Sequence, residues 1–153
     1  MKLEGLSMRE KLFLCRFASA ASARRLHLLA LRVDPGDEPL RRLFEDLAGV
    51  EDKRQERIAS LEAGAGLAAE PCFDQAELQG IAGRFLPSLS ISTGGGSIDR
   101  ESGTYLVECL QRESASLYRT LAEHATDDES RTFFLSSLKE EETHLEFMRH
   151  VVL

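Results

Sequence analysis

The stretch Phe134-Leu-Ser-Ser-Leu138-Lys-Glu-Glu141-Glu-Thr-His144-Leu145 carries the most information about the fold of this chain. Its apolar residues recur at steps of three and four, the spacing of one buried face of a helix. Glu141 falls where that face requires an apolar residue, and His144 follows on the same side three residues later. A carboxylate in a helical core is costly unless it is protonated, paired or bound to a metal. The stretch therefore predicts a helix that carries chemistry on its buried face.

Two other predicted helices also place a carboxylate at a core position. Glu113 interrupts an apolar stripe in the segment 98–125. The other members of that stripe are Leu106, Leu110, Leu117 and Leu121. Glu51 interrupts the stripe of the segment 38–63, and Arg54 takes the next core position. Three carboxylates at core positions of three helices indicate a shared polar site.

The sequence predicts an all-α fold in a single domain, 1–153. The four long helices are expected at about 7–32, 38–63, 98–125 and 127–150, with a crossover at 64–97 that contains a short helix. Short links, such as the turn Asp34-Pro-Gly-Asp37, join the first helix to the second and the third to the fourth, which predicts two antiparallel hairpins. The long connection then has to run along the bundle from one end to the other.

A weak internal repeat supports this layout. Arg41-x-x-Phe44 followed by Glu51-x-x-Arg54 in the first half parallels Arg131-x-x-Phe134 followed by Glu141-x-x-His144 in the second. Leu29-Ala30 and Leu121-Ala122 are related in the same way between the first and third helices. The two hairpins therefore look like copies of one unit.

The chain resembles the rubrerythrin branch of the ferritin-like family, without a rubredoxin domain. Glu113-Ser-Ala-Ser-Leu-Tyr118 is similar to the third helix of that family, and Glu141-Glu-Thr-His144 is similar to the Glu-x-x-His of its last helix. The resemblance implies a ferritin-like four-helix bundle and a di-iron site built from Glu and Glu-x-x-His. Two positions depart from the family pattern: no carboxylate lies near Ala21, and Arg54 stands where a His is expected.

These departures leave two interpretations of the polar site. In the first, Glu113, Glu141 and His144 bind a single ion of iron, manganese or zinc, and Glu51 bridges or lies nearby. In the second, proton uptake and hydrogen bonds balance the carboxylates, with Tyr118 or His27 as partners. In both, the guanidinium of Arg54 cannot act as a ligand but can donate hydrogen bonds to carboxylates.

Two functions correspond to these interpretations. The resemblance implies an oxidoreductase that acts on peroxide, dioxygen or iron with an incomplete di-iron site, and that takes electrons from an external donor. The alternative is a non-catalytic bundle that serves as a structural or partner-binding module, with its polar core closed by Arg54 salt bridges. The family resemblance implies a homodimer in either case.

Composition and charge narrow the classes of protein to which this chain can belong. The net charge is −7 and no basic run contains interleaved aromatics, which argues against nucleic-acid binding. No apolar run approaches the ~20 residues that span a bilayer, and no convincing signal peptide is present, so we expect a cytoplasmic protein without membrane contact. Cys15, Cys72 and Cys109 form no Cys-x-x-Cys motif, which excludes a rubredoxin-type iron centre. Cys15 and Cys109 are expected to act as small buried apolar residues.

Overall fold

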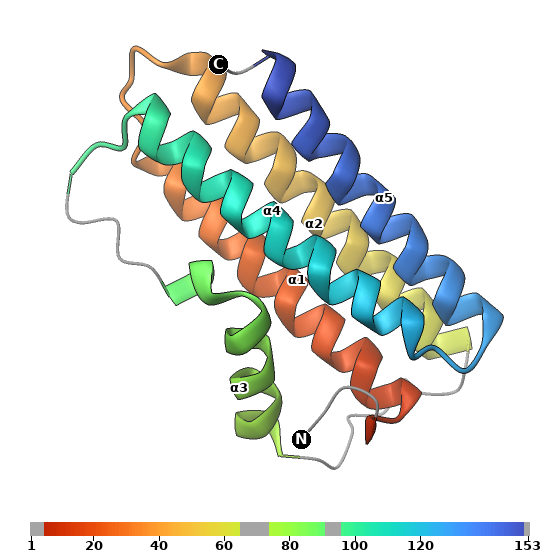
Figure 1. Cartoon of the computed structure of the whole chain (residues 1–153). Coiled ribbons are helices and arrows are strands. Elements are labelled where there is room, and N and C mark those ends of the chain that lie inside the picture. Colours follow the sequence, from red (N-terminus) through yellow and green to blue (C-terminus); the bar gives the residue numbers. More distant parts are fainter. Residues whose placement is uncertain (1–4, 65–73, 91–95, 152–153) are drawn as a thin grey trace.

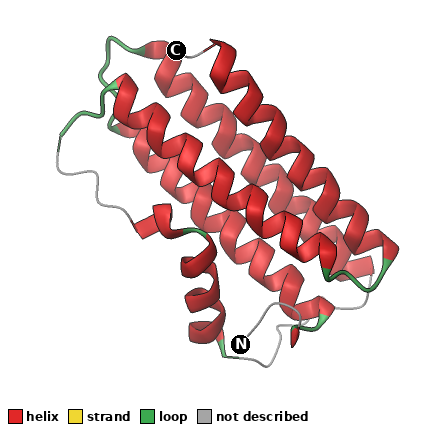
Figure 2. Ribbon diagram, viewed as in Figure 1, coloured by secondary structure: helices red, strands yellow, loops and turns green. Residues whose placement is uncertain are grey.

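The computed structural model describes residues 5–64, 74–90 and 96–151, and helices make up most of this part of the chain (Figures 1 and 2). In chain order the elements are α1 (Met8–Leu31), α2 (Glu38–Gly64), α3 (Gln75–Phe85), the short 3₁₀ helix η2 (Pro87–Ser90), α4 (Arg100–Glu123) and α5 (Asp128–Val151). No strand occurs within these described ranges beyond an isolated parallel bridge between Val33 and Ile98. The all-α prediction is confirmed.

The ends of the long helices follow from local sequence. Ser7 forms a capping box with Glu10 at the start of α1. Asp99 caps α4 by accepting a hydrogen bond from the Ser102 amide. At α5 the capping side chain is Asp127, which accepts from the Ser130 amide, so this helix starts one residue later than expected.

Contacts at the two ends of the bundle fix the direction of the helices. At one end the Ile98 amide donates to the Arg32 carbonyl at 2.8 Å, and Arg100 pairs with Asp37 at 2.6 Å. At the other end the Lys11 ammonium donates to the His124 carbonyl at 2.5 Å. Helix α4 therefore runs antiparallel to α1 and parallel to α2, and the connection between α2 and α4 passes along the bundle (Figure 1).

The crossover is partly described, and its helical part packs against the bundle. Helix α3 and η2 lie beside α1 and α4 (Figure 1). Ile81 and Leu86 are buried and Phe85 is half-buried, so this part of the crossover packs apolar side chains against the bundle. The side chain of Leu78, the loop residue Cys72 and the glycines at 94 and 95 lie outside the part of the structure that is described.

The apolar core is continuous along the four long helices. The core leaves no room for a side chain at Gly103 of α4, where an added Cβ would lie 2.9 Å from the Phe44 ring and 3.3 Å from Leu40. Glycine at this position therefore lets α4 pack closely against α2. No described helix is long and apolar enough to cross a membrane.

Candidate functional site

Helix α2 places two charged residues inside the bundle. Its buried residues include Leu40, Phe44, Leu47 and Ile58, which continue the stripe expected from sequence. Glu51 and Arg54 occupy the two intervening core positions, and the exposed fraction of Arg54 is 0%. Arg54 therefore points into the bundle, at the core position that the apolar spacing of α2 leaves to it. A side chain with this much desolvated charge requires compensating partners.

The carboxylates of two helices meet at the guanidinium of Arg54. Its Nη1 atom donates to Glu51 Oε1 on the same helix and to Glu141 Oε1 on α5, each at 2.7 Å. Glu141 is 2% exposed and Glu51 is 6% exposed, so the three charges are all withdrawn from water. Charge-assisted hydrogen bonds in such an environment are short and strong.

An aromatic ring and a third acidic residue also lie beside the guanidinium. The Arg54 Cζ atom lies 4.9 Å from the centroid of the Tyr118 ring on α4, a cation–π distance. Its Nη2 atom lies 3.6 Å from Glu140 Oε1, beyond hydrogen-bond range. Among the described residues, Nε and Nη2 of Arg54 have no hydrogen-bond acceptor. Arg54 therefore touches α4 and α5 from its place on α2.

Helix α1 contributes a hydroxyl to the same cluster. Ser19 is 1% exposed, and its Oγ lies 2.5 Å from Glu51 Oε2 and 3.0 Å from the Glu51 carbonyl oxygen. The Glu51 carboxylate is thus held between Ser19 and Arg54. All four long helices supply a side chain to this buried cluster, which we define as Ser19, Glu51, Arg54, Tyr118 and Glu141.

Burial determines the protonation of the buried cluster. It raises the pKa of Glu51 to about 7, because desolvation and the nearby Glu141 outweigh the attraction of Arg54. Burial also raises the pKa of Glu141. With both carboxylates ionised the three charges sum to −1. One proton on the carboxylate pair makes the cluster electrically neutral.

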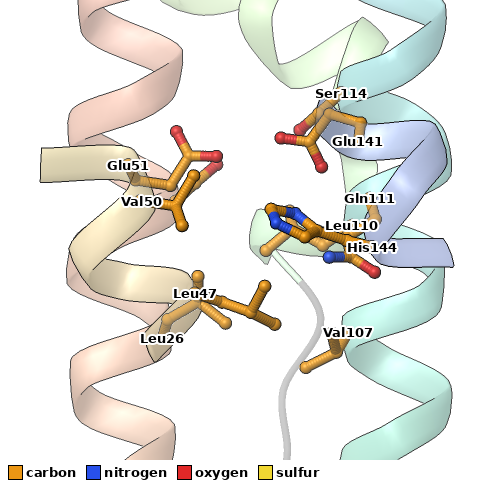
Figure 3. A pocket seen from close by; sticks show the side chains of 11 residues that line it. Leu26, Leu47, Val50, Glu51, Val107, Leu110, Gln111, Ser114, Glu141 and His144 are labelled. Carbon is orange, nitrogen blue, oxygen red and sulfur yellow. The ribbon is translucent and has the colours of Figure 1, made fainter. Parts of the chain in front are cut away.

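A small cavity lies beside the buried cluster and is lined by His144 of α5 (Figure 3). The volume of this cavity is about 10 Å³. Glu51 and Glu141 also line it, so the structure brings three of the four predicted metal ligands to one place. Burial and the Arg54 charge lower the pKa of His144, which favours a neutral ring.

The fourth predicted ligand, Glu113, is directed elsewhere. Its Oε1 accepts a hydrogen bond from the Ser88 amide at 2.7 Å, which ties α4 to the crossover at η2. The core position that sequence reasoning gave to Glu113 is taken by its neighbour Ser114, which is 6% exposed and lines the cavity (Figure 3). One residue in a helix corresponds to a rotation of about 100°. The expected α4 stripe was therefore out of register at this position.

Sequence reasoning missed the polar residues that α1 and α4 contribute: Ser19, Ser22, Gln111 and Ser114. The repeat contained a usable signal, because Ser22 and Ser114 each stand seven residues before the paired leucines Leu29 and Leu121. Ser22 is 2% exposed and lines the cavity, whereas Ala21 is only half-buried. The two hairpins thus carry serine at equivalent inward positions.

Two further expectations concern residues near this region. Cys15 is fully buried, and this burial raises the pKa of its thiol well above the usual range, as suits an apolar role. Cys109 is half-buried. His27, considered as a partner of the carboxylates, lies at the surface, 3.4 Å from Asp52.

The donor set does not fit the metal site that the resemblance implies. Both inward carboxylates, Glu51 and Glu141, are bonded to a permanent cation, and Glu113 is bonded to a backbone amide. Within the described residues, no group of three His, Cys, Asp or Glu side chains is arranged to hold a metal ion. A divalent ion beside Arg54 would also meet its positive charge at close range.

A surface groove lies outside the buried cluster, between α2 and α5. Its lining includes Arg57, Phe133 and Glu140. Arg57 pairs with Glu140 at 2.7 Å, and its guanidinium lies 5.8 Å from the Phe133 ring. Since Glu140 is also 3.6 Å from Arg54, this ion pair lies between the groove and the buried arginine.

Comparison with known proteins yields a structural neighbour. No protein-family model matches the chain, and no curated protein matches it. The structure is similar to the crystal structure of a conserved hypothetical protein, rv2844, from Mycobacterium tuberculosis. The TM-score is 0.59 at 16% sequence identity, over 94% of this chain and 90% of that one. At this identity the likeness concerns the helical fold.

Proposed function

We propose that this chain is a ferritin-like bundle in which Arg54 takes the place of the metal, and that it acts without redox catalysis as a structural or partner-binding module. The observation that carries the proposal is the pair of 2.7 Å contacts from Arg54 Nη1 to Glu51 and Glu141. These are two of the three carboxylates that the resemblance assigns to metal. Here a cation that belongs to the chain itself occupies the space between them.

The connectivity supports the ferritin-like part of the proposal. Ferritin-like bundles have two antiparallel hairpins joined by one long crossover, which makes the second and third long helices parallel. The contacts Ile98–Arg32 and Arg100–Asp37 place the starts of α2 and α4 at the same end. The paired serines Ser22 and Ser114 then stand at equivalent positions of the first and third long helices.

Charge balance supports the metal-independent part. A di-metal site of the family type has four glutamates and two divalent ions, whose charges cancel. In this chain two inward glutamates remain, and Arg54 with one shared proton cancels them. The guanidinium has no exchangeable ligand position, so this site offers no place for peroxide or dioxygen to bind to a metal.

The competing proposal is a single metal ion, favoured by the fact that Glu51, Glu141 and His144 line one cavity. Metal analysis of protein purified without chelators separates the two, together with thermal unfolding in the presence and absence of Fe²⁺, Mn²⁺ and Zn²⁺. We expect metal far below one equivalent per chain and no change in Tm. Stoichiometric metal that is lost in His144→Ala would overturn the metal-independent proposal.

The homodimer and the cytoplasmic location stay predictions. Size-exclusion chromatography with light scattering measures the first, and fractionation of the source cells measures the second. An external electron donor is needed only under the competing proposal.

A further inference from the structure

We propose that the cavity beside the buried cluster is a binding site for one water molecule, which links the His144 ring to the Glu51 and Glu141 carboxylates. The cavity is lined by side chains from all four long helices (Figure 3). The cavity volume of about 10 Å³ is at the lower limit for a single water molecule. It is too small for larger ligands.

The first support is an unsatisfied amide aimed into this space. Gln111 of α4 is 5% exposed and lines the cavity, and neither its Nε2 nor its Oε1 has a hydrogen-bond partner among the described residues. A buried amide group without a partner costs free energy, because it has given up the hydrogen bonds that it makes with water in the unfolded chain. A water molecule accepts from Nε2 and donates to Oε1 alike, which makes it the small molecule that removes this cost.

The second support is the polarity of the other walls. Ser22 and Ser114 add hydroxyls from α1 and α4, and Glu51 and Glu141 add acceptors. Buried waters typically make about three hydrogen bonds to such groups, and cavities that stay dry are lined by apolar residues. The rest of the lining is apolar and consists of Leu26, Leu47, Val50, Val107 and Leu110.

His144 lies where a water in the cavity would connect it to the buried carboxylates. The ring is half-buried and lines the cavity, while the Glu51 and Glu141 carboxylates beside it are buried. A water between them connects the buried carboxylates to a ring that reaches solvent. The charged groups that face it are Glu51 and Arg54 from α2 and Glu140 and Glu141 from α5.

The test is a high-resolution crystal structure of the wild type, Gln111→Met and Val107→Ala, with anomalous data for metals. We expect one water in the wild type and in Val107→Ala, which keeps every polar wall, and loss of it in Gln111→Met. An empty cavity in the wild type would overturn this inference alone. A metal peak would overturn it together with the proposed function, on which it rests in requiring a metal-free site.

A solution measurement covers the case in which Gln111→Met does not fold. Nuclear Overhauser transfer from water to the side-chain amide of Gln111 in the wild type should show a long-lived water beside it. Absence of that transfer, with normal transfer at exposed amides such as Gln79, would contradict the proposal.

Discussion

Arg54 and Glu141 stand 87 residues apart in the chain, yet their side chains meet at 2.7 Å inside the bundle. The contact joins the two hairpins across the core, because Arg54 belongs to α2 and Glu141 to α5. It also explains why this part of the core contains charged side chains and not apolar ones. Once one partner is buried and charged, the other has to remain.

Because the charged partners depend on one another, we expect a large loss of stability when Arg54 alone is replaced. Arg54→Met leaves Glu51 and Glu141 buried without a cation, and we expect the free energy of unfolding at pH 8 to fall by about 3–5 kcal/mol. Urea denaturation measures it. The matched control is Arg57→Met, which breaks a half-exposed pair and should cost about 1 kcal/mol or less. Equal losses in the two variants would contradict a special role for Arg54.

The same charges predict how stability depends on pH. The pKa of Glu51 is about 7 in the folded protein, above the ordinary value of 4.5, so between these values the folded state holds a proton that the unfolded state has released. Its contribution to stability is therefore fully present below pH 4.5 and is lost as the pH rises through 7. The slope from one such group is at most about 1.4 kcal/mol per pH unit.

Glu51→Gln should flatten this decline, since a neutral amide does not titrate. Denaturation curves of the wild type and the variant between pH 4.5 and 8 measure the difference. Some decline will remain, because burial raises the pKa of Glu141 as well. The lowered pKa of His144 acts in the opposite direction, so a stability that still increases with pH in His144→Ala would show that the carboxylates are fully ionised.

A third prediction concerns Glu113, which the structure removes from the site. Glu113→Ala should cost about 1–2 kcal/mol, because the buried Ser88 amide loses its acceptor. Glu113→Gln keeps an acceptor oxygen and should cost less. Hydrogen exchange at the Ser88 amide measures the effect directly, and faster exchange is expected only in the alanine variant. A change in the His144 titration in Glu113→Gln would instead place Glu113 at the buried cluster.

Much of the fold and half of the site could be predicted from the sequence. Helix α2 came out in register because Phe44, Leu47 and Ile58 are large apolar markers on both sides of Glu51 and Arg54. Helix α4 was in register at its four leucines but not at Glu113, because the polar pair at 113 and 114 offered two candidates, and a small inward serine carries no hydrophobic signal. The bonds from Arg54 to both carboxylates depend on side-chain geometry that apolar periodicity does not encode.

A fourth prediction tests the close approach of α4 to α2. Gly103→Ala should lower the free energy of unfolding by about 1–3 kcal/mol, since its Cβ would lie 2.9 Å from the Phe44 ring. Gly49→Ala is the matched control, because a Cβ there meets nothing within 4 Å and alanine favours the helix by up to about 1 kcal/mol. In thermal unfolding we expect Gly103→Ala to lower the Tm and Gly49→Ala to raise it. Stabilisation by both would mean that the helices have room to separate.

The last prediction asks whether the ferritin-like site is recoverable. In the triple variant Ser22→Glu, Ser114→Glu and Arg54→His, four inward glutamates and two histidines would face one another, with −4 charges to balance two divalent ions. We expect it to bind close to two equivalents of Fe²⁺ or Zn²⁺, and its Tm to rise when metal is added. The wild type should do neither, because Arg54 supplies its own cation.

The control uses the register that the sequence alone suggested. Ala21→Glu with Arg54→His adds a carboxylate at the alternative position and keeps the native Glu113. Because Ala21 is half-buried and Glu113 is bonded to Ser88, this variant should bind less metal than the triple variant. Tighter binding by the control, measured by titration calorimetry, would mean that Glu113 rather than Ser114 marks the inward face of α4. The orientation of that one helical turn thus decides which of the two sets of substitutions restores a metal site.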